Sequence, residues 1–404
     1  MTRTKTIIDH SIWRNLPPEI IGDVLYRLPI KSLCRFKCVS PSWNSLISSP
    51  GFAETHLHIS GTPNKPQKTI LITSSHALFS VDFAAANPTA EKLDFTLPGE
   101  RPGNPVRVWG SCNPVCGWGS CNGLVLVSDQ GVSLSLFLLN PFTRECKKLP
   151  QSPLADLCLY EDPHVFQHGL GYDSSTDDYK VVMLLTRPII DSNGYDYINN
   201  GAVYSLKIDA WRRIQDSHYI PEGLLHGVYF NERLHWLWRS PSSGSKVVVA
   251  FDLWDEVFRE VPLPTSFDNY KLGPLVLGSC LCLVVLPFEG DVIEVWMMKK
   301  YGVRESWTKF TMTKHWMGLE DVLYLAAEEE FVLRTSEMIE EVNGVGIIDE
   351  SSLEKLVVYN PKKETLRDMV VCGIPTKYTV GGNYIETLVS PNHGGRIRRH
   401  CEAS

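Results

Sequence analysis

The sequence lacks the short motifs that mark the commonest catalytic sites. It has no glycine-rich loop for a phosphate, no His-Glu-X-X-His zinc motif and no Gly-X-Ser-X-Gly nucleophile turn. Cys112, Cys116 and Cys121 come nearest to a metal cluster, but their spacing fits no common zinc pattern and no histidine lies close to them in the sequence. These absences argue against an enzyme and against a bound metal or other cofactor.

Signals for secretion and for membrane insertion are also missing. Residues 1–5 have no apolar core, and no Asn-X-Ser/Thr acceptor occurs with X other than proline. The most apolar run, residues 272–288, is interrupted by glycines and prolines, so it predicts two buried strands and not a membrane span. The eleven cysteines are an odd number scattered along the chain, which is typical of reduced thiols. We therefore expect a cytoplasmic or nuclear protein, or one found in both.

Positive charge is scarce after the first sixty residues. Those sixty residues carry a net charge of +3, whereas the whole chain of 404 residues carries −7, so residues 61–404 carry −10. Phosphate binding requires a positive field. The charge distribution therefore argues against nucleic acid as the main ligand and favours, weakly, a basic partner.

The N-terminal part contains a row of short helical signals separated by prolines. Pro17 and Pro18 suit a first helical turn, and the apolar residues that follow recur at helical spacing. Pro29 ends this helix and can begin the next, and Ser40 followed by Pro41 begins a third, which ends near residues 48–50. About forty residues bury too little apolar surface to fold alone. From the pattern alone, this segment docks either on the rest of the chain or on a separate protein.

The same residues resemble the F-box. The match runs in order through residues 16–17, 27–33, 35–40, 43, 47 and 50–52, and is closest to the large plant group with a C-terminal F-box-associated domain. The family implies docking to a Skp-type adaptor and, through it, to a cullin. The resemblance assigns the adaptor contact, or its support, to nine residues: Leu16, Pro17, Ile20, Leu25, Leu28, Pro29, Leu33, Val39 and Trp43. Pro41 departs from the family, which often has a basic residue there.

After residue 60 the pattern changes from helix to strand. Short apolar runs such as 69–72, 124–127 and 179–185 are bounded by Gly, Asn, Asp, Ser and Pro, which indicates many antiparallel strands. Similar phrases recur around Asn140, Asp252 and Asn360. Half of the sequence separation between successive members of this set is about 50 residues, which is close to the length of one kelch repeat.

We therefore expect a mainly β protein with a small N-terminal α module. The expected fold is a three-helix F-box followed by a kelch-like β-propeller of about six four-stranded blades, with a β-sandwich as the alternative. Strands within 68–97 and the segment 384–388 are expected to share one blade and close the ring. The expected boundaries are 10–55 for the F-box, 60–395 for the β domain and 396–404 for a flexible tail. Phrases at 119–124, 169–173 and 177–182 resemble the plant F-box-associated domain, which implies recognition of a target protein.

Target contacts are expected in long connections between second and third strands, at 187–200 and 336–352. The first combines aromatic and acidic residues, which suits protein recognition. The alternative for the segment 187–200 is a solvated, variable loop. The alternative for Trp316, which lies in a polar segment, is packing in the core. The candidate residues are Asp191, Tyr195, Asp196, Tyr197 and Trp316.

Taken together, these features predict a non-catalytic substrate-recognition subunit of a Skp–cullin–F-box ubiquitin ligase. The β domain would hold an unidentified target protein for ubiquitination and degradation. The alternative is a ligase-independent protein-interaction scaffold. Adaptor binding separates the two, and a chain with both Pro17→Ala and Leu33→Ala is expected to lose it.

Overall fold

The structure is a computed structural model of the 404-residue chain. It describes residues 17–59, 67–73, 77–94, 119–128, 135–158, 165–191, 194–222, 226–268, 270–287, 292–313, 318–325, 330–336, 340–342, 345–347, 355–376 and 378–392. The chain forms two compact units. One comprises Met1–Lys65 with Thr387–Val389, and the other comprises Pro66–Glu386 with Ser390–Ser404. The tail expected at 396–404 lies outside the described residues.

The first unit contains four short helices: α1 (Pro18–Tyr26), α2 (Ile30–Phe36), α3 (Pro41–Ile47) and α4 (Pro50–Ile59). The helix start predicted at Ser40 is confirmed, because Oγ of Ser40 caps α3 by accepting the N–H of Trp43 at 3.2 Å. The sequence predicted three helices, with a stop near Pro50. That expectation was incomplete, because proline is tolerated at the first position of a helix. Ser49 accepts the N–H of Phe52 at 3.3 Å and so helps α4 begin there.

Apolar side chains from all four helices are buried in this unit. Leu25, Ile30, Leu33, Ile47 and Phe52 each have less than a tenth of their surface exposed. α4 contacts both α1 and α3, and the ring of Tyr26 stacks on that of Phe52 with 4.7 Å between centroids. A ring nitrogen of His56 lies 2.9 Å from the carbonyl of Leu28. These contacts fix the helices around a small core.

The second unit is built from strands. Four sheets have four strands each, in the orders β27-β1-β2-β3, β4-β5-β6-β7, β17-β18-β19-β20 and β21-β22-β25-β26. Their bounds are β1 (Gln67–Thr73), β2 (Leu78–Val81), β3 (Ala90–Leu93), β4 (Ser120–Cys121), β5 (Leu124–Ser128), β6 (Leu136–Asn140), β7 (Glu145–Lys148), β17 (Tyr270–Leu277), β18 (Cys280–Pro287), β19 (Val292–Met298), β20 (Trp307–Thr313), β21 (Gly318–Leu325), β22 (Phe331–Ser336), β25 (Lys355–Asn360), β26 (Thr365–Asp368) and β27 (Tyr378–Ile385).

A fifth sheet has nine strands in the order β11-β10-β9-β8-β13-β14-β15-β16, with β12 paired to β14, and β23 and β24 form a separate ribbon. Short 3-10 helices lie at Ala155–Cys158 and Arg304–Ser306. The remaining strand bounds are β8 (Val165–Asp173), β9 (Asp178–Asp191), β10 (Gly194–Ser205), β11 (Ala210–Ser217), β12 (Ile220–Pro221), β13 (His226–Phe230), β14 (Arg233–Arg239), β15 (Lys246–Asp252), β16 (Phe258–Val261), β23 (Glu340–Val342) and β24 (Val345–Ile347).

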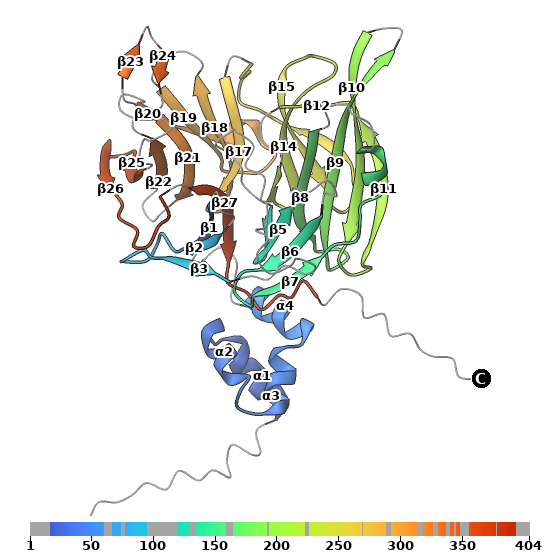
Figure 1. Ribbon diagram of the computed structural model, residues 1–404, viewed down its shortest axis with the longest axis vertical. Helices are drawn as coiled ribbons and strands as arrows, with labels where there is room; N and C mark the ends of the chain where they lie inside the picture. The colour runs from blue at the N-terminus through green and yellow to red at the C-terminus, as the bar shows by residue number, and fades with distance from the viewer. Residues whose placement is uncertain are drawn as a thin grey trace, which may run out of the picture. The chain divides into compact units, whose positions relative to one another are not determined.

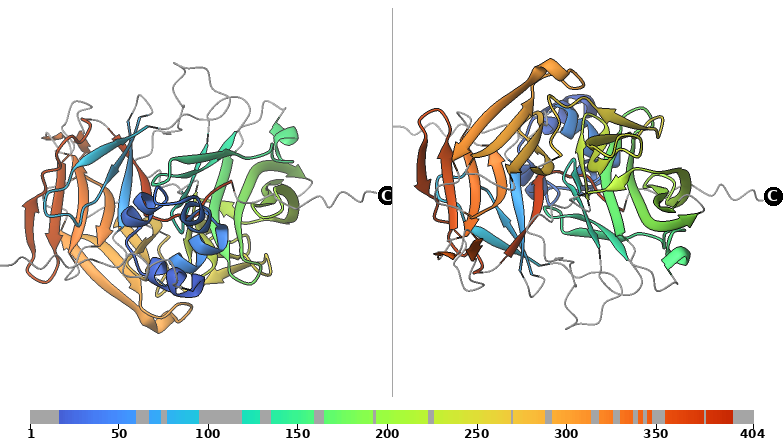
Figure 2. Two further views of the ribbon diagram at one scale, coloured as in Figure 1. Left: turned by 90° about the horizontal axis from the view of Figure 1, so that it is seen from below. Right: turned by 90° about the horizontal axis from the view of Figure 1, so that it is seen from above.

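The sheets of this unit are arranged around a common axis (Figure 2). This is a β-propeller-like arrangement and not the two stacked layers of a β-sandwich. The separate four-stranded sheets number four, whereas the sequence predicted about six blades. The difference arises because β8–β11 and β13–β16, each an antiparallel run of four strands, are joined by parallel pairing of His226 with His168 and of Gly227 with Gly169. A Cβ atom on Gly227 would lie 2.5 Å from the ring of Trp236, so the close approach requires glycine.

The recurring phrases of the sequence fall at equivalent turns. Asn140, Asp252 and Asn360 each end the third strand of a four-stranded run. The side-chain oxygen of each accepts a backbone N–H within the turn that follows, at 2.9, 2.9 and 3.1 Å. Four residues later Arg144, Glu256 and Glu364 adopt positive φ angles. The recurring sequence phrases therefore mark a recurring turn, in which the side-chain oxygen of Asn or Asp accepts a backbone N–H.

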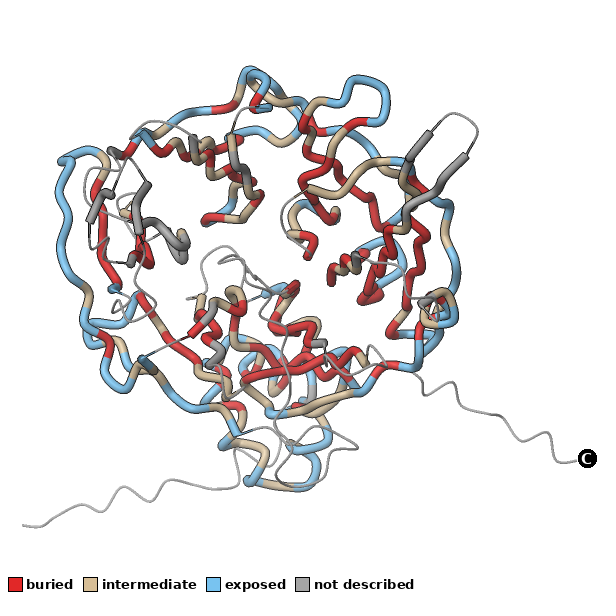
Figure 3. The backbone as a smooth tube through the Cα atoms, turned by 45° about the horizontal axis from the view of Figure 1, so that its top comes forward, coloured by how far each residue is buried: buried red, intermediate tan, exposed pale blue. Residues whose placement is uncertain are grey.

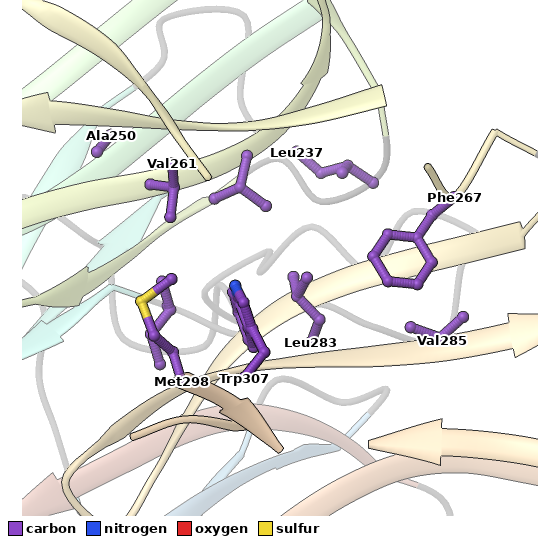
Figure 4. Close-up of a cluster of buried hydrophobic side chains, with 10 residues drawn as sticks. Leu237, Ala250, Val261, Phe267, Leu283, Val285, Met298 and Trp307 are labelled. Carbon is purple, nitrogen blue, oxygen red and sulfur yellow. The ribbon is translucent and has the colours of Figure 1, made fainter. Parts of the chain in front are cut away.

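Neighbouring sheets share apolar clusters. In one cluster Leu237, Ala250 and Val261 of the nine-stranded sheet pack against Leu283 and other side chains of the β17–β20 sheet, which include Trp307 (Figure 4). The indole N–H of Trp307 also donates to the carbonyl of Pro262 at 2.9 Å. Trp211 makes the same kind of bond to the carbonyl of Pro150 at 2.8 Å. Buried residues follow the strands, while many of the turns between them are exposed (Figure 3).

The two ends of the strand-bearing segment share one sheet. β27 pairs with β1 from Gln67 opposite Ile385 to Thr73 opposite Tyr378. The hydroxyls of Ser80 and Tyr384 lie 2.8 Å apart, and Lys68 forms an ion pair with Glu386 at 2.7 Å. The predicted ring closure through residues at 68–97 and 384–388 is therefore present, although the strand itself begins earlier, at Tyr378.

Candidate docking surfaces

The helical unit exposes apolar side chains on α1 and after α2. Ile20 and Val24 have 46% and 55% of their surface exposed, and Val39 has 60%. Ile20 and Val24 are four residues apart, so they lie on one face of α1. Two bulky aliphatic side chains exposed side by side on one helix are a typical feature of a protein-interaction surface. The basic residues Lys31 and Arg35 are exposed on α2 nearby in sequence.

The nine residues predicted to make or support the adaptor contact include both exposed and buried side chains. Leu16 lies outside the described residues. Pro17, Ile20, Pro29 and Val39 are exposed, and Leu28 and Trp43 are partly buried.

Leu25 and Leu33 have 1% and 0% of their surface exposed and belong to the core. They are therefore not available for direct contact with a partner. Val24 was absent from the predicted set, although its spacing from Ile20 was visible in the sequence.

The segment expected to be a loop at 187–200 is a β-hairpin. β9 runs to Asp191 and β10 begins at Gly194, with the register Asp191 opposite Gly194 and Arg187 opposite Ile198. The loop expectation was wrong because the turn residues at its tip suggested a longer irregular segment. The backbone of Asp191, Tyr195 and Asp196 is described but their side chains are not, Tyr197 is partly buried, and Trp316 lies outside the described residues.

Polar bonds across the base of this hairpin hold it in place. Oγ1 of Thr186 donates to Oδ1 of Asn199 at 2.5 Å, and Nε of Arg187 donates to Oδ1 of Asn200 at 2.8 Å. Thr186, Asn199 and Asn200 are all buried. Because a buried amide needs its partners, these bonds fix where the hairpin leaves the sheet.

Two other connections between second and third strands lie at the same end of the strand unit. The β14–β15 turn is closed by Gly244 N–H donating to the carbonyl of Ser240 at 2.8 Å. The connection between β22 and β25, expected to be a long loop at 336–352, contains the β23–β24 ribbon, with Glu340 opposite Ile347. Figure 1 shows this ribbon and the tip of the β9–β10 hairpin at one end of the unit. Candidate target-contacting segments therefore gather at one end.

A buried ionic cluster around Lys180 in the strand unit is structural. Nζ of Lys180 lies 2.7 Å from Oδ2 of Asp173 and donates to the carbonyl of Leu253 at 2.7 Å. Burial would raise the pKa of Asp173, but hydrogen bonds from Lys180, Ser175 and Thr176 outweigh it and hold that pKa at about 2. Every charge in the cluster has a partner, so its role is to join a hairpin turn to the adjacent four-stranded run.

The part of the chain that the structure describes contains neither a candidate metal site nor a candidate membrane-spanning helix. No group of three or more His, Cys, Asp or Glu side chains is placed to hold a metal ion. No helix in the described ranges has both the length and the apolar character that a membrane span requires.

Comparison with known proteins gives the same two parts. A model of the F-box domain matches residues 13–55, and a model of the F-box associated beta propeller domain matches residues 108–390. The F-box protein CPR1 of Arabidopsis thaliana is 35% identical over 321 residues, which cover 74% of this chain and 73% of that protein. The F-box/kelch-repeat protein At3g23880 of the same plant is 32% identical over 311 residues, which cover 73% of this chain and 78% of that protein.

Among solved structures, TolB from Acinetobacter baumannii aligns over 83% of this chain and 71% of its own, with a TM-score of 0.44 and 10% identity. That likeness is too weak to support an inference. The two family matches together span most of the chain, and the CPR1 match extends over nearly three quarters of it. The chain belongs to the F-box proteins that carry a C-terminal F-box-associated β-propeller domain.

Proposed function

We propose that this protein is a non-catalytic substrate receptor of a Skp–cullin–F-box ubiquitin ligase. The helical unit binds a Skp-type adaptor, which links the chain to a cullin. The propeller-like unit binds a target protein and holds it near the ubiquitin-charged enzyme. Such a receptor accelerates transfer by raising the local concentration of the target, which requires no catalytic side chain of its own.

The observation that carries this proposal is the exposed apolar face of α1 within a segment that matches the F-box. Ile20 and Val24 are exposed although the same helix buries Leu25. A helix of nine residues gains little by exposing two aliphatic side chains to water. Binding of an adaptor over this face would remove that apolar surface from water and so stabilise the complex.

Adaptor capture tests the proposal. The double substitution of Pro17 and Leu33 by alanine is a poor probe, because Leu33 is fully buried and its truncation disturbs the core. Val24→Glu changes only an exposed position, so the chain should fold but fail to co-purify with a Skp-type adaptor. Val370→Glu is the matched control, since Val370 is 84% exposed in the other unit.

Equal adaptor capture by the two glutamate variants and the unchanged protein would contradict docking through α1. Loss of capture in the Val370 variant as well would point to a general effect of charge. A chain that binds its target but captures no adaptor would be the ligase-independent scaffold.

The proposal extends to the number of blades and to the location of the protein in the cell. We infer that β8–β11 and β13–β16 act as two blades joined by their parallel pairing, so that the unit works as a kelch-like propeller of six blades. We also propose that the protein works in the cytoplasm, the nucleus or both, where the seven cysteines whose side chains are described remain free thiols.

A further inference from the structure

β20 is an edge strand of its sheet. It is the last strand of the β17–β20 sheet, and among the described strands it pairs only with β19, from Trp307 opposite Met298 to Thr313 opposite Val292. The register does not shift along this ladder, so no bulge bends the strand. Figure 2 shows the gold and orange strands of this sheet at the periphery of the strand unit. In the described part of the chain, no strand covers the outer side of β20.

The ladder determines which backbone groups of β20 point outward. The N–H of Lys299 donates to the carbonyl of Ser306 at 3.1 Å, so these two residues form a hydrogen-bonded pair. In an antiparallel ladder such pairs alternate with pairs that exchange no hydrogen bonds. Every second residue counted from Ser306 therefore bonds to β19, whereas Lys309 and Thr311 direct their N–H and C=O groups away from it. Both residues are exposed, so an added strand can reach these groups.

The last strands of the other four-stranded runs are protected in ways that β20 is not. β3, β7, β16 and β26 have four residues each, at least two of them charged, and a register shift interrupts the pairing of β11. β20 has seven residues without proline, and only Lys309 among them is charged. Natural proteins shorten, charge or bulge their edge strands because open edges pair with other strands. β20 is therefore the last strand best suited to accept another strand.

The turn that leads into β20, residues 299–306, is basic, although residues 61–404 as a whole carry a net charge of −10. Lys299, Lys300 and Arg304 are exposed in this basic turn beside a single acid, Glu305. Arg304 donates to the uncharged carbonyl of Pro264 at 3.4 Å, and none of the three cations forms an ion pair with a described carboxylate. Uncompensated cations attract carboxylates. The charge at this end of β20 therefore favours an acidic partner.

We propose that β20 takes up an extended segment of the target protein as an added antiparallel strand, and that acidic residues follow this segment in its sequence. The inference rests on the proposed function and names the chemistry of the partner. Antiparallel to β20, the segment runs from Thr313 towards Trp307, so its C-terminal end reaches the basic turn. Main-chain bonds to Lys309 and Thr311 supply affinity. Phe310 lies between them on the opposite face and is partly buried, so apolar side chains at alternate positions of the segment complement it.

Synthetic peptides test the inference on the full chain. The probe is a nonapeptide of three threonine–valine pairs followed by three glutamates, with blocked ends, and its binding is measured by fluorescence anisotropy. A version with N-methyl groups on alternate residues cannot complete a ladder, so it should bind at least about tenfold more weakly. A version that ends in three lysines meets the basic turn with like charge and should also bind at least about tenfold more weakly.

Protein variants locate the binding edge. Thr311→Pro removes an outward N–H and keeps the bonds to β19, so it should weaken binding of the glutamate-ended peptide at least about tenfold. Thr311→Val keeps that N–H and should change affinity less than about twofold. Lys300→Glu reverses a charge of the basic turn and should weaken binding about fivefold, whereas Lys92→Glu makes the same change at an exposed position of β3 and should weaken it less than about twofold. Thermal unfolding checks that all four variants are folded.

Three results would overturn the inference. The N-methylated peptide could bind as tightly as its parent, or Thr311→Pro and Thr311→Val could bind it equally well, so that no ladder forms on β20. The Lys300 and Lys92 variants could lose affinity equally, which would indicate general electrostatics. The unchanged protein could sediment as a dimer that Thr311→Pro dissociates, so that a second copy occupies the edge. Adaptor capture measured on the same samples keeps this test separate from the proposed function, because it involves only the helical unit.

Discussion

The hydroxyl of Tyr301 donates a hydrogen bond to Nε2 of His235 over 2.7 Å and so joins two neighbouring sheets. His235 lies on β14, and Tyr301 lies in the turn between β19 and β20. Nδ1 of His235 lies 3.1 Å from the carbonyl of Val228, which can only accept, so Nδ1 carries the proton. The imidazole is therefore neutral and satisfied on both sides.

Removing the Tyr301 hydroxyl should loosen this contact. Tyr301→Phe leaves a buried ring nitrogen of His235 without its donor, which is expected to lower the free energy of unfolding by about 1–3 kcal/mol. Urea denaturation measures the change. Tyr219→Phe is the control, because its hydroxyl reaches Glu260 only at 3.3 Å in an exposed position, and should cost less than about 0.5 kcal/mol. Equal losses of unfolding free energy in the two variants would show that the Tyr301–His235 hydrogen bond contributes no more to stability than an exposed one.

Mild acid should destabilise the strand unit through its buried histidines. Burial lowers the pKa of His235 to about 4 and that of His226 to about 3, from an ordinary value of 6.5. The unfolded chain then binds protons that the folded chain cannot, so stability is complete above pH 6.5 and falls as the pH drops to 4. Each histidine contributes a slope approaching about 1.4 kcal/mol per pH unit.

Denaturation midpoints measured across this pH range check the histidine effect, and His235→Gln should flatten the profile. The carboxylate of Asp173 acts in a lower window, because its pKa of about 2 lies below the ordinary 3.8. A loss of stability that begins only below pH 4 would assign acid sensitivity to carboxylates instead.

Two stacked tryptophans on β14 should respond differently to the same substitution. Trp236 and Trp238 are both fully buried, with ring centroids 5.6 Å apart. The indole of Trp238 donates to Oε1 of Gln167 at 2.8 Å, whereas that of Trp236 has no hydrogen-bond partner among the described atoms. Trp238→Phe should therefore cost about 1–3 kcal/mol more than Trp236→Phe. Equal costs in chemical denaturation would show that only packing volume matters at both sites.

The buried lysine of β9 should contribute strongly to the stability of the strand unit. Lys180→Met removes the cation beside Asp173 and leaves a buried carboxylate uncompensated, at a cost of about 3–5 kcal/mol. Lys207→Met is the matched control, since the ammonium of the exposed Lys207 donates to the carbonyl of Thr176, and its loss should cost less than about 1 kcal/mol. Thermal unfolding compares them, and similar midpoints for the two variants would refute a structural role for the cluster.

Local signals in the sequence predicted much of the helical unit. Pro17, Pro29 and Ser40 mark helix starts because proline and serine suit those positions regardless of tertiary contacts. The apolar stripe of α1 was visible too, but it is wide enough to cover two faces. Which residues turn inward depends on where the other helices lie, so Leu25 could not be distinguished from Val24.

In the strand unit too, local turns could be predicted from the sequence, whereas long-range strand pairing could not. Turns after Asn140, Asp252 and Asn360 recur in the sequence because their backbone geometry depends on a nearby side-chain oxygen. The joining of two four-stranded runs depends instead on Gly169 and Gly227, which are distant in sequence and meet only after folding. Pairing that rests on such long-range contacts leaves no periodic signal, and blade separation could not be predicted for that reason.

The pairing of β1 with β27 has a consequence for synthesis of the protein. The ribosome makes the α1–α4 helices first and β27 after every other strand of the described chain. A growing or prematurely ended chain therefore lacks both the strand that closes the ring and residues 387–389, which belong to the helical unit. Neither unit can form its full set of contacts until this last part of the chain has left the ribosome, so we expect the two units to be completed together at the end of synthesis.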